Sequence, residues 1–158
     1  MRSLLVVTMV LLISCSKCGA ADAPRPPAAP APDRPLFERL VEEAGRRDQA
    51  DPSTKQVLAA LQAAGLPIES ERQHLGQAIG ARHCVMMNTL HHVTLSVCEF
   101  ADERSAAAGA QASREALSQI AGRTVRVKRS TVLSVIDSQA DDTSRATARK
   151  ALEAFDTL

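Results

Sequence analysis

The stretch RHCVMMNTLHHVTLSVCEF, residues 82–100, decides the fold, because apolar and polar side chains alternate in it twice. The first alternating run covers residues 84–88 and the second covers residues 93–98, with a short polar turn at residues 89–92 between them. Two period-2 runs joined by a short turn are typical of an antiparallel β-hairpin. We therefore predict a β-hairpin over residues 82–100.

The two cysteines of this stretch predict how its strands pair. If Cys84 faces Cys98, the pairs that follow are Val85–Val97, Met86–Ser96, Met87–Leu95 and Asn88–Thr94. This register puts the aliphatic residues on one face and the cysteines on the other. Opposed Cα atoms lie about 4.5–5.5 Å apart, which a disulfide can span. We therefore expect Cys84 and Cys98 to be bonded if the chain is exported to an oxidising compartment.

The flanking sequence predicts helices around a second hairpin. Apolar spacing indicates a helix from Leu36 to about Gly45, and Asp51 and Pro52 are expected to begin a second helix that ends at Gly65. An edge strand is weakly indicated near residues 68–72. A helix at 102–120, strands within 124–137 and a last helix capped by Asp141, Asp142 or Thr143 follow. The prediction is one α+β domain at residues 36–158 (core 51–157), with a mainly antiparallel sheet of two hairpins, about four strands, and helices packed on one face.

The N-terminus has the layout of an export signal. Arg2 is followed by the apolar run Leu4–Ile13, and about 20 such residues would be needed to span a membrane. The run ends in Leu12-Ile13-Ser14-Cys15, which resembles the lipobox of bacterial lipoprotein precursors. The resemblance implies that residues 1–14 are a signal peptide and that Cys15 is acylated. It also implies a cell-envelope location, and Ser16 after the cysteine favours the outer membrane.

Residues 15–35 follow as a tether dominated by Ala and Pro. Such a segment lacks the apolar bulk that would offset its ordering entropy, so we interpret it as an extended spacer rather than a ligand for a polyproline-binding domain. The expected partners are the membrane, through the lipid anchor, and an envelope protein. Nucleic acid is not expected, because loss of Arg2 from 19 basic residues leaves 18 against 18 acidic ones.

Two functions remain open for the domain. No G-x-S-x-G, H-E-x-x-H or glycine-rich phosphate loop is present, so nothing in the sequence supports catalysis, and no cofactor is expected. The favoured interpretation is an envelope lipoprotein with a non-enzymatic binding or structural accessory domain. The alternative is a periplasmic copper-binding or redox accessory protein, since thiolate, thioether and imidazole suit Cu(I). Its candidate ligands are His83, Cys84, Met86, His91, His92 and Cys98. The two interpretations compete, because an oxidised cysteine pair offers no thiolate.

Overall fold

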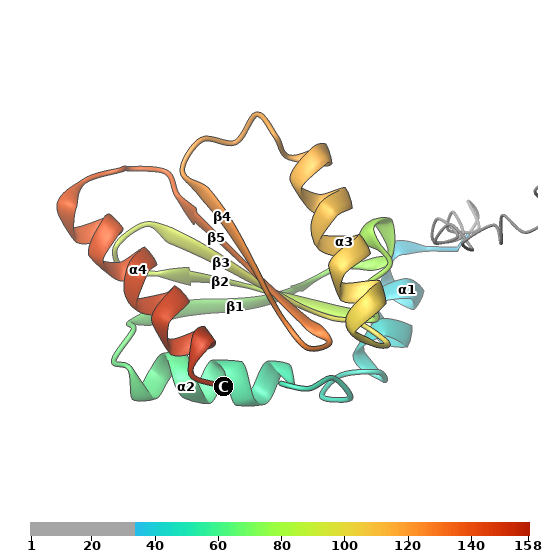
Figure 1. Ribbon diagram of the computed structural model, residues 1–158. Helices are drawn as coiled ribbons and strands as arrows, with labels where there is room; N and C mark the ends of the chain where they lie inside the picture. The colour runs from blue at the N-terminus through green and yellow to red at the C-terminus, as the bar shows by residue number, and fades with distance from the viewer. Residues whose placement is uncertain (1–33) are drawn as a thin grey trace, which may run out of the picture.

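A twisted antiparallel sheet is the centre of the computed structural model, which describes residues 34–158 (Figure 1). Its five strands are in the order β1-β2-β3-β5-β4. They are β1 Ile68–His74, β2 His83–Thr89, β3 Val93–Glu99, β4 Arg123–Lys128 and β5 Thr131–Asp137. The α+β class and both predicted hairpins are confirmed, and the sheet has one strand more than expected.

The central hairpin has the predicted register. Cys84 lies opposite Cys98, Val85 opposite Val97, and Met87 opposite Leu95. The chain turns at residues 90–92. Because alternate side chains point to opposite faces, the cysteines are separated from the aliphatic residues as expected.

The additional strand, β1, forms one edge of the sheet. It pairs with β2 and reads Ile-Glu-Ser-Glu-Arg-Gln-His. Most of its side chains are charged or polar, so the apolar alternation that identifies a half-buried strand is weak. Charged side chains on an edge strand also oppose pairing with another chain.

Four α-helices surround the sheet. They are α1 Leu36–Ala44, α2 Thr54–Ala63, α3 Glu103–Ala116 and α4 Asp142–Asp156, and a short 3-10 helix, η1, covers Gln77–Ile79. The expected cap of α2 is wrong: Ser53 caps it, and the Ser53 hydroxyl accepts from the Gln56 backbone N–H at 3.3 Å. This capping box with Gln56 satisfies two N-terminal donors. Asp51 instead pairs with Arg129 at 2.8 Å.

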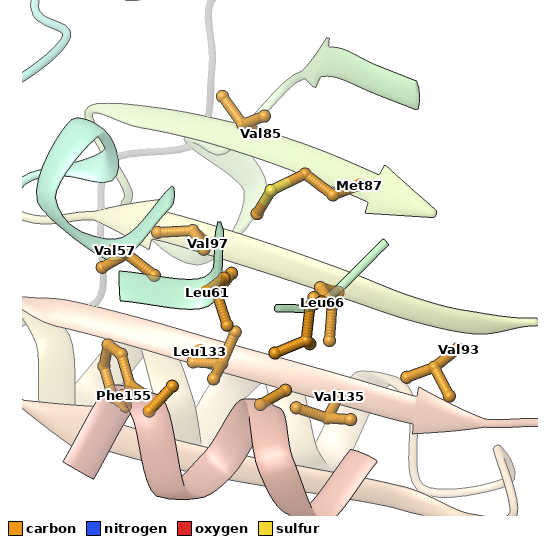
Figure 2. Packing of buried hydrophobic residues seen from close by; sticks show 13 residues of the cluster. Val57, Leu61, Leu66, Val85, Met87, Val93, Val97, Leu133, Val135 and Phe155 are labelled. Atoms are coloured by element: carbon orange, nitrogen blue, oxygen red, sulfur yellow. The ribbon is translucent and has the colours of Figure 1, made fainter. Parts of the chain in front are cut away.

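Helices α2 and α4 close the aliphatic face. Val57 and Leu61 of α2 and Phe155 of α4 are fully buried against strand residues such as Leu133 and Leu95 (Figure 2). Burying apolar area of this kind contributes about 25 cal/mol per Å². This cluster is the larger of the two in the domain.

Helix α3 lies on the opposite face, so the prediction that the helices share one face is wrong. It packs with Cys84, Cys98 and Val132, which alternate with the aliphatic residues of the first face. Gly109 allows α3 to pack directly on the Phe100 ring, since a Cβ atom at residue 109 would lie 2.2 Å from Phe100 Cε1. Apolar residues therefore lie on both faces of the sheet at the end that holds Cys84 and Cys98. Helices pack on both faces because each has apolar side chains to bury.

The remaining helix, α1, lies at one end of the sheet beside β1 and β2 (Figure 1). None of the helices in residues 34–158 has the length and apolarity that a bilayer crossing requires. The predicted signal peptide, Cys15 and the tether up to residue 33 lie outside the described residues.

Candidate functional site around the Cys84–Cys98 disulfide

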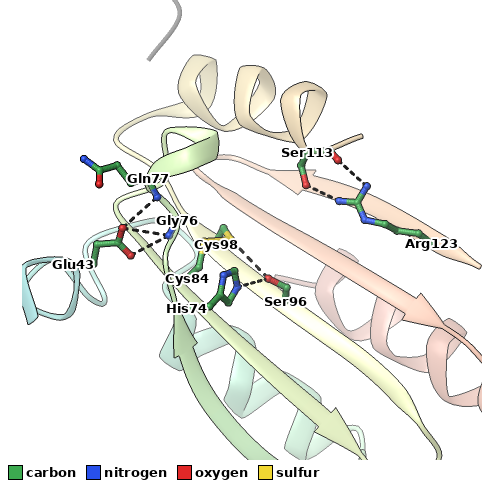
Figure 3. Close-up of a disulfide and its surroundings, with 9 residues drawn as sticks. All are labelled: Glu43, His74, Gly76, Gln77, Cys84, Ser96, Cys98, Ser113 and Arg123. Carbon is green, nitrogen blue, oxygen red and sulfur yellow. Dashed lines mark hydrogen bonds between the residues drawn. A yellow bond between two sulfur atoms is a disulfide. The ribbon is translucent and has the colours of Figure 1, made fainter. Parts of the chain in front are cut away.

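The structure joins the sulfur atoms of Cys84 and Cys98, which are 2.06 Å apart. Both residues are buried, with exposed fractions of 0% and 4%. They lie where β2 begins and β3 ends, on the face that α3 partly covers (Figure 3). The bond therefore links two central strands in the interior of the domain.

His74 adds an imidazole to this pair. It is the last residue of β1 and lies opposite Cys84, so three neighbouring strands place His74, Cys84 and Cys98 in one row. The His74 Nε2 atom is 2.9 Å from Ser96 Oγ, which is 3.8 Å from Cys98 Sγ. Burial lowers the pKa of His74, and a backbone hydrogen bond at Leu75 opposes that shift. The ring is therefore neutral at pH 7, and a neutral imidazole can ligate a metal.

The chemistry open to this cluster depends on its oxidation state. The Nε2 or Nδ1 atom of His74 and the two sulfur atoms lie within 4.8 Å of one another. As a disulfide, the cysteines supply no thiolate. After reduction by two electrons, two thiolates and one imidazole would form a soft ligand set that suits Cu(I) or Zn²⁺.

The predicted ligands His83, His91 and His92 do not join this site. His91 and His92 lie at the β2–β3 turn, at the far end of the strands from Cys84. His83 points to the opposite face, whereas Met86 lies on the same face as Cys84, two pairs further along the hairpin and opposite Ser96. The sequence interpretation missed His74, because its place beside Cys84 depends on the register of an edge strand that is not joined to β2 by a tight turn.

A loop held by α1 covers the disulfide. The Glu43 carboxylate accepts hydrogen bonds from the backbone N–H groups of Gly76, at 3.0 Å, and Gln77, at 3.2 Å (Figure 3). A Cβ atom on Gly76 would lie 2.8 Å from Cys84 Sγ. The loop can therefore approach the sulfur this closely only with glycine at position 76.

A second buried polar group lies on the other face. His83 is 1% exposed, and neither ring nitrogen has a hydrogen-bond partner. Its cross-strand neighbour Glu99 is fully buried and accepts from the backbone N–H of Thr54, at 2.5 Å, and of Gln49. Burial lowers the pKa of His83, whereas the nearby Glu99 carboxylate raises it. Glu99 therefore joins the hairpin to the N-terminus of α2.

A shallow groove of about 420 Å³ lies near the β2–β3 turn, away from the cysteines. Its lining residues come from α4 and the α2–β1 loop and include His91; they are Gly65, Leu66, Pro67, His91, Asp142, Thr143, Ala146, Thr147 and Lys150. The groove is open to solvent, and the Thr147 hydroxyl in it donates to the backbone oxygen of Thr143 at 2.9 Å.

The fold and site define a disulfide-bonded α+β domain with a histidine beside the bond. Compared with protein-family models, curated proteins and solved structures, the chain has no significant match in any of the three.

Proposed function

We propose that this protein is a lipid-anchored envelope protein whose α+β domain serves as a non-enzymatic binding or structural accessory module. The observation that carries the proposal is the disulfide between Cys84 and Cys98. Disulfides persist in exported proteins and are rare in the cytosol, so this bond supports the export signal inferred at the N-terminus.

Anchoring at Cys15 completes the proposal. Each buried CH₂ group of an acyl chain contributes roughly 0.8 kcal/mol, so several chains on one cysteine make a durable anchor. Residues 16–35 would then link the domain to the bilayer and allow a separation of at most about 3.1 Å per residue where they are extended. Ser16 favours the outer membrane, by resemblance to lipoprotein sorting patterns.

The test compares Cys15→Ser with Cys18→Ser, which removes a cysteine only three positions away. Wild type and Cys18→Ser should fractionate with membranes and carry the acyl mass, whereas Cys15→Ser should remain unprocessed or be released. Processing and fractionation of Cys15→Ser like the wild type would show that the lipobox interpretation is wrong.

The position of His74 favours a second candidate function, the capture of Cu(I) or Zn²⁺ after reduction. A dithiol reductant would transfer two electrons to the Cys84–Cys98 bond and become a disulfide itself, leaving two thiols. Binding of the metal by both sulfurs would release the two thiol protons. His74 would supply the third ligand, and the Ser96 hydroxyl or a water molecule the fourth.

Thiol counting and metal titration distinguish the two functions. A chain with no reactive thiol at Cys84 and Cys98 under mild dithiol treatment remains a structural module. Two free thiols that Cu(I) protects would instead support metal capture. In that case His74→Ala should weaken Cu(I) binding at least about tenfold, as expected for loss of one ligand. His91→Ala is the matched control and should bind like the wild type; equal binding by His74→Ala would exclude the proposed ligand set.

A further inference from the structure

Helix α1 is oriented with its polar side toward the domain. Arg39 donates to Gln77 Oε1 at 3.2 Å, and the buried Glu43 holds the loop over the disulfide. These two residues are four apart and so lie on one stripe of the helix. The helix is therefore attached to the domain largely through charged side chains.

The apolar stripe of the same helix faces solvent. Leu36, Phe37 and Val41 are 60%, 75% and 55% exposed. Phe37, Val41 and Ala44 follow one another at helical spacing, so they form a continuous face. A surface helix normally buries its apolar stripe, and an exposed one of this kind marks an interaction surface.

The size of this face argues against a second copy of the chain as its occupant. The exposed parts of Leu36, Phe37 and Val41 amount to roughly 300–400 Å², judged from typical side-chain areas. A stable interface buries about 800 Å² on each partner. A pair of nine-residue helices would therefore be too small to hold a dimer by this face alone.

The position of α1 in the chain points to a bilayer. Leu36 is 21 residues after Cys15, so a lipid on Cys15 would keep α1 within about 65 Å of the bilayer, at about 3.1 Å per residue. An anchor makes insertion of a small apolar face an intramolecular step, which needs little affinity of its own. Arg34 and Arg46, before and after the helix, have exposed side chains that pair with Glu42 at 2.7 and 2.5 Å.

We propose that the apolar face of α1, formed by Leu36, Phe37, Val41 and Ala44, lies in the interface of the bilayer to which Cys15 is anchored. The proposal rests on the proposed anchoring and adds a second membrane contact to it. Interfacial helices bury their apolar face about 5–10 Å into the boundary between headgroups and acyl chains. The domain would then rest on the membrane by α1.

A tryptophan reporter tests this contact directly, because the chain has no Trp. The lipidated Phe37→Trp protein is reconstituted into vesicles of equal parts phosphatidylcholine and phosphatidylglycerol, with or without brominated phosphatidylcholine. Fluorescence of residue 37 should shift to the blue, and brominated lipid should quench it by about half, since the bromines lie at the depth of an interfacial helix. The control is Leu90→Trp, at a 55% exposed position in the β2–β3 turn.

Solvent-like emission and no quenching at residue 37, as at residue 90, would overturn the proposal. A blue shift without lipid that grows with protein concentration would also overturn it and would assign the face to a second copy. Adding Val41→Asp to the reporter should remove most of the quenching, because it places a charge on the inserted face while leaving the buried core unchanged.

The mass of the purified protein shows whether Cys15 is acylated, independently of the fluorescence of residue 37. If Cys15 carries no acyl chain, the same reporter is measured in the unlipidated full chain at high lipid concentration. Quenching there still supports the α1 contact, and its absence overturns it. The two proposals can therefore fail independently.

Discussion

Removal of the Cys84–Cys98 disulfide should lower the free energy of unfolding by an amount that follows from the length of the loop it closes and from the burial of the two cysteines. The perturbation is the double substitution Cys84→Ala/Cys98→Ala, made together with Cys18→Ser so that Cys15 is the one cysteine left in the sequence. The cysteines are 14 positions apart, so their bond closes a loop of about 15 residues. In the chain-entropy account, closing such a loop stabilises the folded state by about 3 kcal/mol.

Removal of the two buried sulfur atoms further lowers the free energy of unfolding. Both cysteines are buried against Ala106, Ala110 and Val132, so truncation to alanine leaves small voids that cost about 1 kcal/mol in total. We expect a loss of about 4 kcal/mol from a total stability that is typically 5–15 kcal/mol. With an m-value of about 1.5 kcal/mol/M, the urea midpoint should fall by about 2–3 M.

Urea unfolding followed by far-UV circular dichroism is the appropriate assay, because the chain has neither Trp nor Tyr. The matched control is Asn88→Ala/Thr94→Ala, a cross-strand pair on the same face joined by a 3.0 Å hydrogen bond. It should cost only about 1 kcal/mol. A midpoint shift no larger than that of the control would refute the view that the disulfide is a structural staple.

Three further substitutions test other features of the fold. Burial lowers the pKa of His83, so the unfolded chain takes up its proton first and stability should fall as the pH drops below about 6.5. In His83→Phe, the free energy of unfolding, measured by urea titration at several pH values, should fall less as the pH drops. An unchanged dependence of this free energy on pH would exclude His83 as a cause. Gly109→Ala should lower the melting temperature despite better helix propensity, because its Cβ would clash with Phe100 at a cost of about 1–3 kcal/mol. Glu43→Gln should speed reduction of the disulfide about tenfold, measured by thiol alkylation, because it weakens charge-assisted bonds to the covering loop; the exposed Glu42→Gln should not.

The hairpin and its register could be predicted from sequence because two independent signals agree there. Alternation of apolar residues sets which face each side chain occupies, and the cysteine pair sets which residues are opposed. The capping position of α4 was similarly limited to three neighbouring residues, of which Asp141 is the cap. Local patterns of this kind need no knowledge of distant parts of the chain.

The sequence-based predictions fail where contacts between distant parts of the chain determine the structure. Helix α3 has a small-residue stripe that fits either face of a sheet, and its position opposite α2 and α4 depends on Phe100 and Val132 filling the other side. His74 joins the cysteines through the register of β1, which is separated from β2 by an eight-residue segment carrying η1 rather than by a tight turn. Neither arrangement has a short-range sequence signal.

The two faces of the sheet differ in a way that locates the functional features. One face is closed by aliphatic residues of α2 and α4, whereas α3 covers only one end of the other, leaving Asn88 and Ser96 half-buried. The disulfide lies at the boundary between the covered and open parts of that second face. There Gly76 contacts Cys84, and Glu43 of α1 holds Gly76. Because the same helix carries the exposed apolar face, displacement of α1 would act first on the loop that shields the sulfur atoms. Membrane contact and access to the disulfide should therefore be coupled through Glu43.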